Sequence, residues 1–218
     1  MKLEFLCDSY KIKEIARLRK IDLKEINDTI LLKKAEENKK SIKIEWQEHE
    51  KKLMSLINMI LPNLDDDFVI KIYIFPNEVP VGACNCQTKE ILFGYKNEYD
   101  GFHLVTICHE ITHILIYKYR KEKLISRVTD ETIAFLVAEC EIRKQLTGKE
   151  YFTKFFDGNL SELHNKAVYT ARSNLDIWNE YIKEKEKNVE KLLFEIEKNV
   201  SIEEKEKYNS AKLKDFLN

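Results

Sequence analysis

Proline and glycine are scarce in this chain, which has three prolines and five glycines among 218 residues. All three prolines and three of the glycines fall between residues 62 and 101, so turns and strands should concentrate there. Residues 1–61 and 159–218 contain neither residue type. In both flanks apolar residues recur at helical spacing among many charges, which predicts amphipathic helices.

The chain also lacks an excess of charge of either sign, since 37 basic residues nearly balance 38 acidic ones. This balance gives no indication of a polyanion-binding surface, so we expect no nucleic-acid partner. No run approaches the ~18 consecutive apolar residues of a membrane span, and residues 1–20 lack the apolar segment and cleavage site of a signal peptide. We therefore expect a cytoplasmic protein without a membrane partner.

The cysteines do not form a disulfide framework, because their number, five, is odd and their spacing is irregular. This usage fits a reducing compartment. Cys84 and Cys86 are the one close pair, and a single CxC without further ligands is a weak metal signal. We interpret them as two small thiols on the same side of a strand or in a loop.

Two strands and two helices are predicted between the flanks. The segments "FVIKIYIF" (68–75) and "KEILFGY" (89–95) are rich in β-branched and aromatic residues, which is typical of strands. Residues 102–120 are mostly apolar and contain no breaker, so they should form a buried helix. A second helix should run from 129 to 146 and end near Gly148, as a glycine C-cap would end it.

The expected fold class is therefore α+β, with a small core flanked by N- and C-terminal helices. We divide the chain into a helical N-terminal extension (1–61), a core with a short sheet (62–150) and a helical C-terminal region that packs on the core (151–218). An apolar stripe in the last region predicts one long helix that packs on the body or on a partner. Its members are Ile182, Val189, Leu192, Leu193, Ile196 and Val200.

The most informative stretch is "HEITH", residues 109–113, inside the predicted buried helix. Side chains at i and i+4 of a helix lie on one face ~5–6 Å apart, so His109 and His113 can both direct a ring nitrogen at one metal ion. Glu110 is rotated by about 100° from His109, which keeps it out of the ligand shell but within reach of a water on that metal. Zinc lowers the pKa of such a water to about 7, so Glu110 can act as the general base.

A buried helix whose two histidines are satisfied by hydrogen bonds is the competing interpretation. Two imidazoles and a carboxylate are costly to bury on an apolar helix, and a metal ion removes that cost. A hydrolytic zinc site has three protein ligands and an open position, whereas a structural site closes with four. The third ligand must come from another element, and Glu131, Glu139 and Glu141 on the next predicted helix are the candidates.

"HEITH" and the downstream "DETIA" (130–134) together resemble the gluzincins, metallopeptidases of the thermolysin and aminopeptidase type. In that family HExxH is followed at similar spacing by an Asn/Asp-Glu-x-x-Ala motif. The resemblance covers about residues 68–146 and implies a zincin-like core with one zinc ion per chain. By this resemblance the metal ligands are His109, His113 and Glu131, the general base is Glu110, and Asp130 orients a histidine.

The same resemblance implies two further features. Gluzincins use an edge strand, antiparallel to the substrate, ahead of the active-site helix, and residues 89–95 occupy that place in the sequence. They also carry a Tyr, His or Arg further along the chain that stabilises the oxyanion, for which His164, Tyr169 and Arg172 are candidates. We interpret His49 and His103 as structural.

The sequence thus predicts a zinc-dependent peptidase that acts on a peptide or protein substrate. Two alternatives stay open. One is a catalytically silent zincin-like module, in which the metal stabilises the fold and the helices bind a partner protein. The other is a regulatory protease with a single protein substrate. A homodimer formed through the C-terminal helical stripe is also open.

Overall fold

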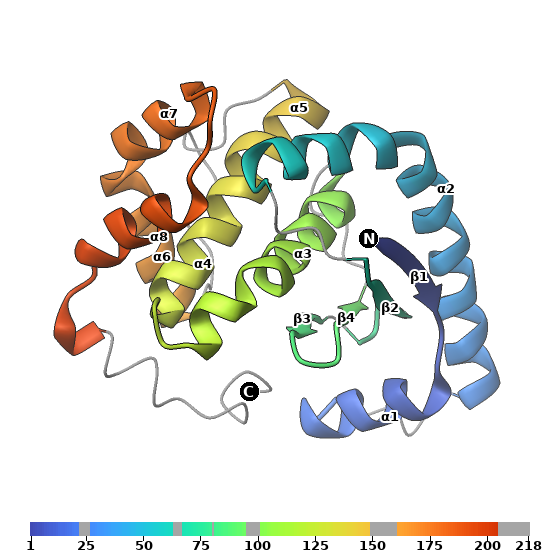
Figure 1. Ribbon diagram of the computed structural model, residues 1–218. Coiled ribbons are helices and arrows are strands. Elements are labelled where there is room, and N and C mark those ends of the chain that lie inside the picture. Colours follow the sequence, from blue (N-terminus) through green and yellow to red (C-terminus); the bar gives the residue numbers. More distant parts are fainter. Residues whose placement is uncertain (22–26, 63–66, 80, 95–100, 149–160, 205–218) are drawn as a thin grey trace.

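The computed structural model describes residues 1–21, 27–62, 67–79, 81–94, 101–148 and 161–204. These residues form an α+β protein in which helices pack around a four-stranded sheet, as the sequence predicts (Figure 1). In this part of the chain we find no helix whose length and apolar character would let it cross a membrane.

The helices of the described residues are α1 (Ser9–Leu18), α2 (Asp28–Ile60), α3 (Phe102–Lys121), α4 (Arg127–Phe135), α5 (Arg143–Thr147), α6 (Glu162–Ser173), α7 (Leu175–Lys183) and α8 (Val189–Lys198). A π-helical segment, η1 (Leu136–Ile142), joins α4 to α5. Helices α3 and α4 lie next to each other, between the sheet and the C-terminal helices (Figure 1). This arrangement places the HEITH helix between the sheet and the helix that carries Glu131.

The sheet contains β1 (Lys2–Leu6), β2 (Val69–Phe75), β4 (Glu90–Gly94) and β3 (Gly82–Asn85), in that order. Strand β2 pairs in parallel with both β1 and β4, while β3 pairs with β4 in the antiparallel direction. The predicted strands at 68–75 and 89–95 are confirmed as β2 and β4, with residue 95 outside the described part of the chain.

Strand β1 corrects the prediction that residues 1–61 are helical throughout. Its sequence "KLEFL" consists largely of Leu, Lys and Glu, which are strong helix formers, and five residues carry too little alternation to outweigh them. Pairing with β2 supplies the backbone hydrogen bonds that the local sequence does not predict.

The prediction that residues 89–95 form the edge strand of the sheet is wrong. Residues 90–94 lie between β2 and β3, so the outer position belongs to β3. The four residues "GACN" of β3 include a glycine and no β-branched or aromatic residue, and therefore give no strand signal.

The side chains of β2 alternate between two hydrophobic clusters, as the pleat of a strand requires. Ile70, Ile72 and Ile74 are fully buried in the main core, which α2, α3 and the C-terminal helices share. Tyr73 and Phe75 point to the opposite face, where α1 covers them. Because both faces are covered, β2 is a nearly continuous apolar run.

The predicted helix over 129–146 is confirmed as a continuous helical segment that ends at Gly148, whose φ is 69°. Glycine adopts this left-handed conformation without steric cost. Within the segment, η1 is a π-helical stretch, a feature that occurs mostly inside α-helices and frequently at functional sites.

The single long C-terminal helix is wrong, because α6, α7 and α8 are separate helices. Asparagine, and not glycine or proline, stands at the breaks between these helices. Asn174 donates to the carbonyl of Thr170 at the end of α6, and Asn188 accepts from the backbone of Lys191 at the start of α8. Such local side-chain bonds favour helix ends. The apolar stripe packs on the protein's own core, and residues 205–218 lie outside the described part.

Candidate metal centre

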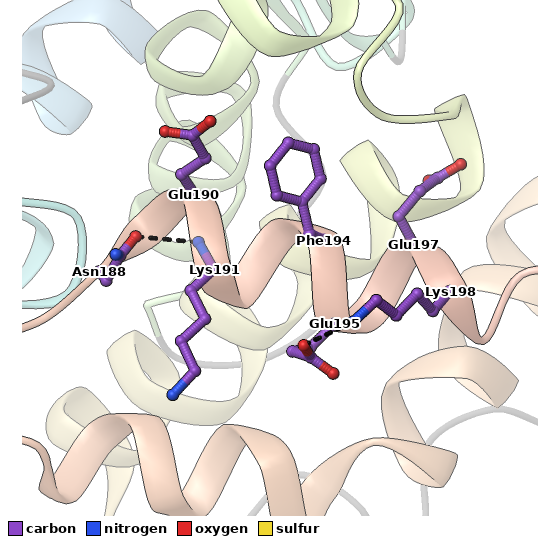
Figure 2. A pocket seen from close by; sticks show the side chains of 7 residues that line it. All are labelled: Asn188, Glu190, Lys191, Phe194, Glu195, Glu197 and Lys198. Atoms are coloured by element: carbon purple, nitrogen blue, oxygen red, sulfur yellow. Dashed lines mark hydrogen bonds and ion pairs between the residues drawn. The ribbon is translucent and has the colours of Figure 1, made fainter.

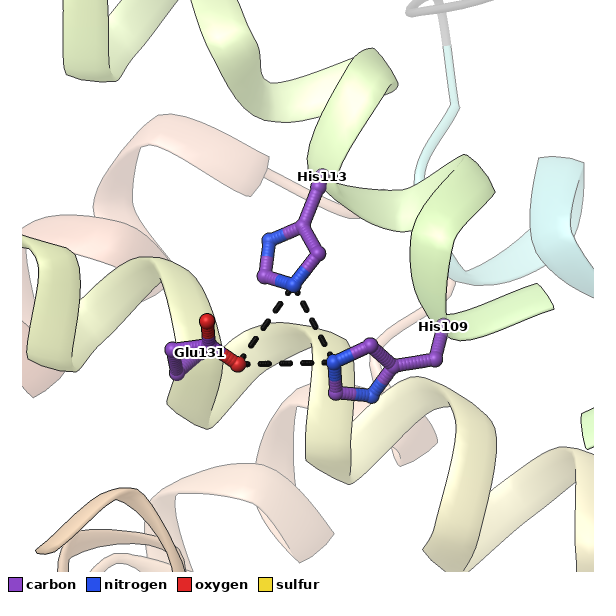
Figure 3. A group of neighbouring side chains, drawn as sticks. All are labelled: His109, His113 and Glu131. Atoms are coloured by element: carbon purple, nitrogen blue, oxygen red, sulfur yellow. Dashed lines mark hydrogen bonds and ion pairs between the residues drawn. The ribbon is translucent and has the colours of Figure 1, made fainter. Parts of the chain in front are cut away.

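His109 and His113 on α3 and Glu131 on α4 direct their polar atoms at a common point (Figure 3). The two Nε2 atoms are 3.1 Å apart. Glu131 Oε2 lies 3.4 Å from His109 Nε2 and 3.5 Å from His113 Nε2. Within the described residues, this is the one group of three or more His, Cys, Asp or Glu side chains with such geometry.

The spacing of the three donor atoms fits a tetrahedral metal ion. Ligand atoms at bond lengths of ~2.0–2.1 Å in a tetrahedron lie ~3.3 Å from one another, close to all three observed separations. An ion held by these three residues would keep one tetrahedral position for a ligand from outside the group. The group can therefore hold a metal ion.

Burial supports the same conclusion. Glu131 is 6% exposed, and its Oε2 is a buried oxygen for which no hydrogen-bond partner is found among the described residues. The nearest polar atoms to this oxygen are imidazole nitrogens at 3.4–3.6 Å, and a cation at the common point would compensate the burial of the carboxylate more closely.

Asp130 and Arg120 hold His113 in one orientation. Nδ1–H of His113 donates to Asp130 Oδ1 at 2.9 Å, and Arg120 Nη1 donates to Asp130 Oδ2 at 2.6 Å. Since Asp130 accepts the Nδ1 proton, Nε2 is the nitrogen of His113 that faces the common point, and its lone pair would bind a metal ion after loss of the Nε2 proton. This is the orienting role that the gluzincin resemblance implies for Asp130.

The site carries strong internal electrostatics. Burial alone would lower the pKa of His113, but the charges of Asp130 and Glu131 outweigh it and raise that pKa well above its usual value. Burial would likewise raise the pKa of Glu131, whereas His113 and His109 hold it well below its usual value. The positive histidine partly neutralises the two carboxylates, as a metal ion would.

Glu110 lies beside the edge strand. It is 7% exposed, and a methyl group placed on Gly82 of β3 would stand 3.7 Å from its Oε1. In the described part of the chain, no hydrogen bond or ion pair engages its carboxylate. The carboxylate, next in sequence to His109, is thus available to accept a proton.

Helix α6 brings one of the three oxyanion candidates to the centre. His164 Nε2 lies 3.6 Å from Glu131 Oε2, and its Nδ1 lies 2.6 Å from the hydroxyl of Ser161. Tyr169 is 65% exposed, and its ring contacts Lys166. No interaction within the described residues joins Tyr169 to the metal group, and Arg172 is exposed.

The remaining candidates have structural contacts instead. Glu139 pairs with Arg143, and Glu141 accepts a hydrogen bond from the indole of Trp178. The structure therefore brings Glu131, among the three glutamates, to the two histidines. His103 Nε2 lies 2.6 Å from a carboxylate oxygen of Glu45, which ties α3 to α2 and agrees with the structural interpretation of this histidine. His49 lies partly exposed on α2.

Sequence reasoning missed Arg120. It follows His113 by seven residues, almost two helical turns, and therefore lies on the same face of α3. That spacing could have marked it as a partner of Asp130.

A surface cavity of about 530 Å³ lies elsewhere, along α8 (Figure 2). Its lining residues come from α8 and its N-cap: Asn188, Glu190, Lys191, Phe194, Glu195, Glu197 and Lys198. None of them belongs to the metal group, and the cavity contains no cluster of catalytic side chains. The metal centre is therefore the stronger candidate for function.

Comparison with protein-family models, with curated proteins and with solved structures found no match. The functional assignment rests on the residues and geometry of the metal centre.

Proposed function

We propose that this chain is a zinc-dependent hydrolase of peptide bonds with a gluzincin-like site. The observation that carries the proposal is the triangle of donor atoms from His109, His113 and Glu131, with edges of 3.1, 3.4 and 3.5 Å. Two imidazoles, one carboxylate and a free fourth position form the ligand pattern of hydrolytic zinc sites. Among the described residues, no fourth side chain joins the group.

A bound zinc ion would supply Lewis acidity, which acidifies water and polarises a substrate carbonyl. Glu110 then accepts a proton from the water and passes it to the leaving amine. Its carboxylate has no competing hydrogen bond within the described residues, so no contact must break first.

His164 fits the oxyanion-stabilising role better than Tyr169, because His164 contacts Glu131 whereas Tyr169 points into solvent. The hydroxyl of Ser161 fixes the orientation of the His164 ring through Nδ1. Nε2–H can then donate to an oxygen that gains charge in the transition state.

The position of β3 supports a peptide as the substrate. Strand β3 is an edge of the sheet, and Gly82 brings its backbone close to Glu110. An extended peptide can add to such an edge by main-chain hydrogen bonds, which would lay it beside the general base.

Zinc content and peptide hydrolysis, measured together on variants, test the proposal. Glu110→Gln should keep about one zinc per chain and lose hydrolysis by ~10²–10⁴-fold. His113→Ala should lose zinc and activity together, because a ligand is removed. Glu122→Gln, at the exposed end of the same helix, is the matched control and should resemble the wild type.

Hydrolysis that survives in Glu110→Gln would rule out Glu110 as the base. Absence of zinc from the wild type, even after reconstitution, would remove the peptidase proposal. Casein is a suitable first substrate. A peptide library should follow, because a regulatory protease with one protein substrate would not cleave casein.

The distance from His164 to Glu131 also favours a second candidate, the catalytically silent zinc module. His164 Nε2 lies 3.6 Å from Glu131 Oε2, but it is not within 4.8 Å of all three donor atoms, so it would have to shift toward the histidines to become a fourth ligand. If His164 closed the fourth position, the site would be structural. Cobalt-substituted protein distinguishes the two, since His164→Ala should change the absorption spectrum strongly only if His164 is a ligand.

A further inference from the structure

Two thiols lie beside the metal centre and have no role in the proposed hydrolysis. Cys84 is in β3, Cys86 follows directly after its end, and their sulfur atoms are 3.4 Å apart. All five cysteines of the chain are described and free, and no other pair is in sulfur contact. A disulfide has an S–S distance of ~2.05 Å, so an approach of only ~1.3 Å would join these two.

Arg120 connects the thiol pair to a proposed metal ligand. Its Nη2 contacts Cys86 Sγ at 3.6 Å, and its Nη1 donates to Asp130 Oδ2 at 2.6 Å. The other oxygen of Asp130 accepts from His113 at 2.9 Å. The sulfur of Cys86 is thus the outer end of a chain of polar contacts that terminates on an imidazole of the centre.

The environment of Cys86 suits a reaction with a small oxidant. The Cys84 thiol donates a hydrogen bond to Cys86 and, together with the charges of His113 and Arg120, holds the pKa of Cys86 below its usual value despite burial. The thiolate is the nucleophilic form of cysteine. Cys86 is 7% exposed, which favours a small oxidant over the disulfide of another protein.

We propose that Cys84 and Cys86 form a thiol redox site, which hydrogen peroxide oxidises to a disulfide and which thereby weakens metal binding at the adjacent centre. This coupling rests on the metal centre of the proposed function. The thiol chemistry does not.

The reaction balances with peroxide as the only oxidant. The Cys86 sulfur attacks one peroxide oxygen, the O–O bond breaks, and a sulfenic acid and one water form. The Cys84 sulfur then attacks the Cys86 sulfur, the S–S bond forms, the S–O bond breaks, and a second water leaves. The two sulfurs lose two electrons, which reduce the peroxide.

Oxidation removes the acceptor that Cys86 presents to Arg120. A disulfide sulfur carries no charge and is a poor acceptor, so the guanidinium keeps only its contact with Asp130. Without its second contact the guanidinium is no longer fixed in one orientation, so Asp130 loses a fixed partner at Oδ2 and holds the ring of His113 less firmly. Direct loss of such a supporting partner costs about 10–100-fold in metal affinity, and for this indirect effect we expect about ten-fold.

The experiment treats the full-length protein with hydrogen peroxide and follows two readouts. Peptide mapping by mass spectrometry should find a disulfide between Cys84 and Cys86, already in metal-free protein. The zinc dissociation constant, measured by competition with a chromophoric chelator, should rise about ten-fold and return after dithiothreitol. Cys86→Ser, which lacks the nucleophile, should show neither the disulfide nor a change of zinc affinity with peroxide, whereas Cys140→Ser, the matched control, should respond like the wild type.

Arg120→Lys separates the connection from the thiols, because lysine cannot contact Asp130 and Cys86 with one planar group. This variant should form the disulfide while its zinc affinity no longer responds to peroxide. A full response in Arg120→Lys would overturn the role of Arg120.

Failure of the disulfide to form would overturn the redox site, whatever the metal content. A disulfide that leaves zinc affinity unchanged would overturn the coupling. If the reduced protein binds no zinc, both the coupling and the proposed function fail. A disulfide that still forms in this metal-free protein would show that the thiol redox site is independent of that failure.

Discussion

Replacing Asp130 by asparagine should weaken metal binding although no ligand is removed. Both carboxylate oxygens are engaged, Oδ1 by His113 and Oδ2 by Arg120. Asparagine keeps one oxygen and puts an NH2 group in the other position. If the NH2 group faces Arg120, two donors meet. If it faces His113, Nδ1 must become the acceptor, and Nε2 carries the proton and loses the lone pair that would bind the metal.

The size of the effect follows from the burial of Asp130, which is 1% exposed, so that water cannot replace the lost contact. Loss of a partner behind a metal-binding histidine costs about 10–100-fold in metal affinity, or about 1.4–2.8 kcal/mol. A hydrogen bond to a charged group contributes ~1.5–3 kcal/mol, which agrees. We therefore expect the zinc dissociation constant of Asp130→Asn to rise ~10–100-fold.

Competition with a chromophoric chelator measures this constant directly. Asp176→Asn, at an exposed position on α7, is the control and should bind zinc like the wild type. Circular dichroism verifies that both variants are folded. A folded Asp130→Asn variant with unchanged zinc affinity would refute the role of Asp130 in fixing the ring of His113.

Two further outcomes are expected. Zinc binding should release the proton of His113 Nε2, so zinc affinity should fall by about ten-fold for each pH unit below the raised pKa of metal-free His113. Calorimetry in buffers of different ionisation enthalpy measures this release. A zinc affinity that does not change with pH would contradict the prediction. Glu197→Ala should lower the free energy of unfolding by ~1–3 kcal/mol in urea titrations, since Glu197 Oε2 accepts hydrogen bonds from Ser126 and Thr129 at the start of α4. Glu195→Ala removes only an exposed ion pair with Lys198 and should change the free energy of unfolding little. Equal effects of the Glu197 and Glu195 variants would contradict the role of Glu197.

The part of the site on α3 is predictable because its geometry is local. The helical period alone places His109 and His113 on one face and Glu110 beside them. Glu131 is different. Three glutamates share the following helical segment, and only the packing of α4 against α3 decides which of them reaches the histidines. The family resemblance predicts Glu131 as the third metal ligand, whereas helical spacing does not distinguish it from the other two glutamates.

The missed features all depend on distant partners or on weak local signals. Strand β1 exists because it pairs with β2, although its composition favours a helix. The breaks between the C-terminal helices depend on the side-chain bonds of Asn174 and Asn188, residues that are also common inside loops and on helix surfaces. Arg120 on α3 can hold Asp130 in place only because the packing of α4 against α3 brings Asp130 next to it.

The parallel pairing of β1 with β2 has a consequence during synthesis. Lys2 pairs with Val69 and Leu6 with Tyr73, so the first strand leaves the ribosome well before its partner exists. At ~5–20 residues per second, the wait lasts several seconds. In that interval "KLEFL" must stay unpaired or be sheltered by a chaperone, and the sheet that supports α3 cannot be completed until β2 and β4 have emerged. Slowing translation between α2 and β2 should therefore increase aggregation of the nascent chain, and not of the finished protein.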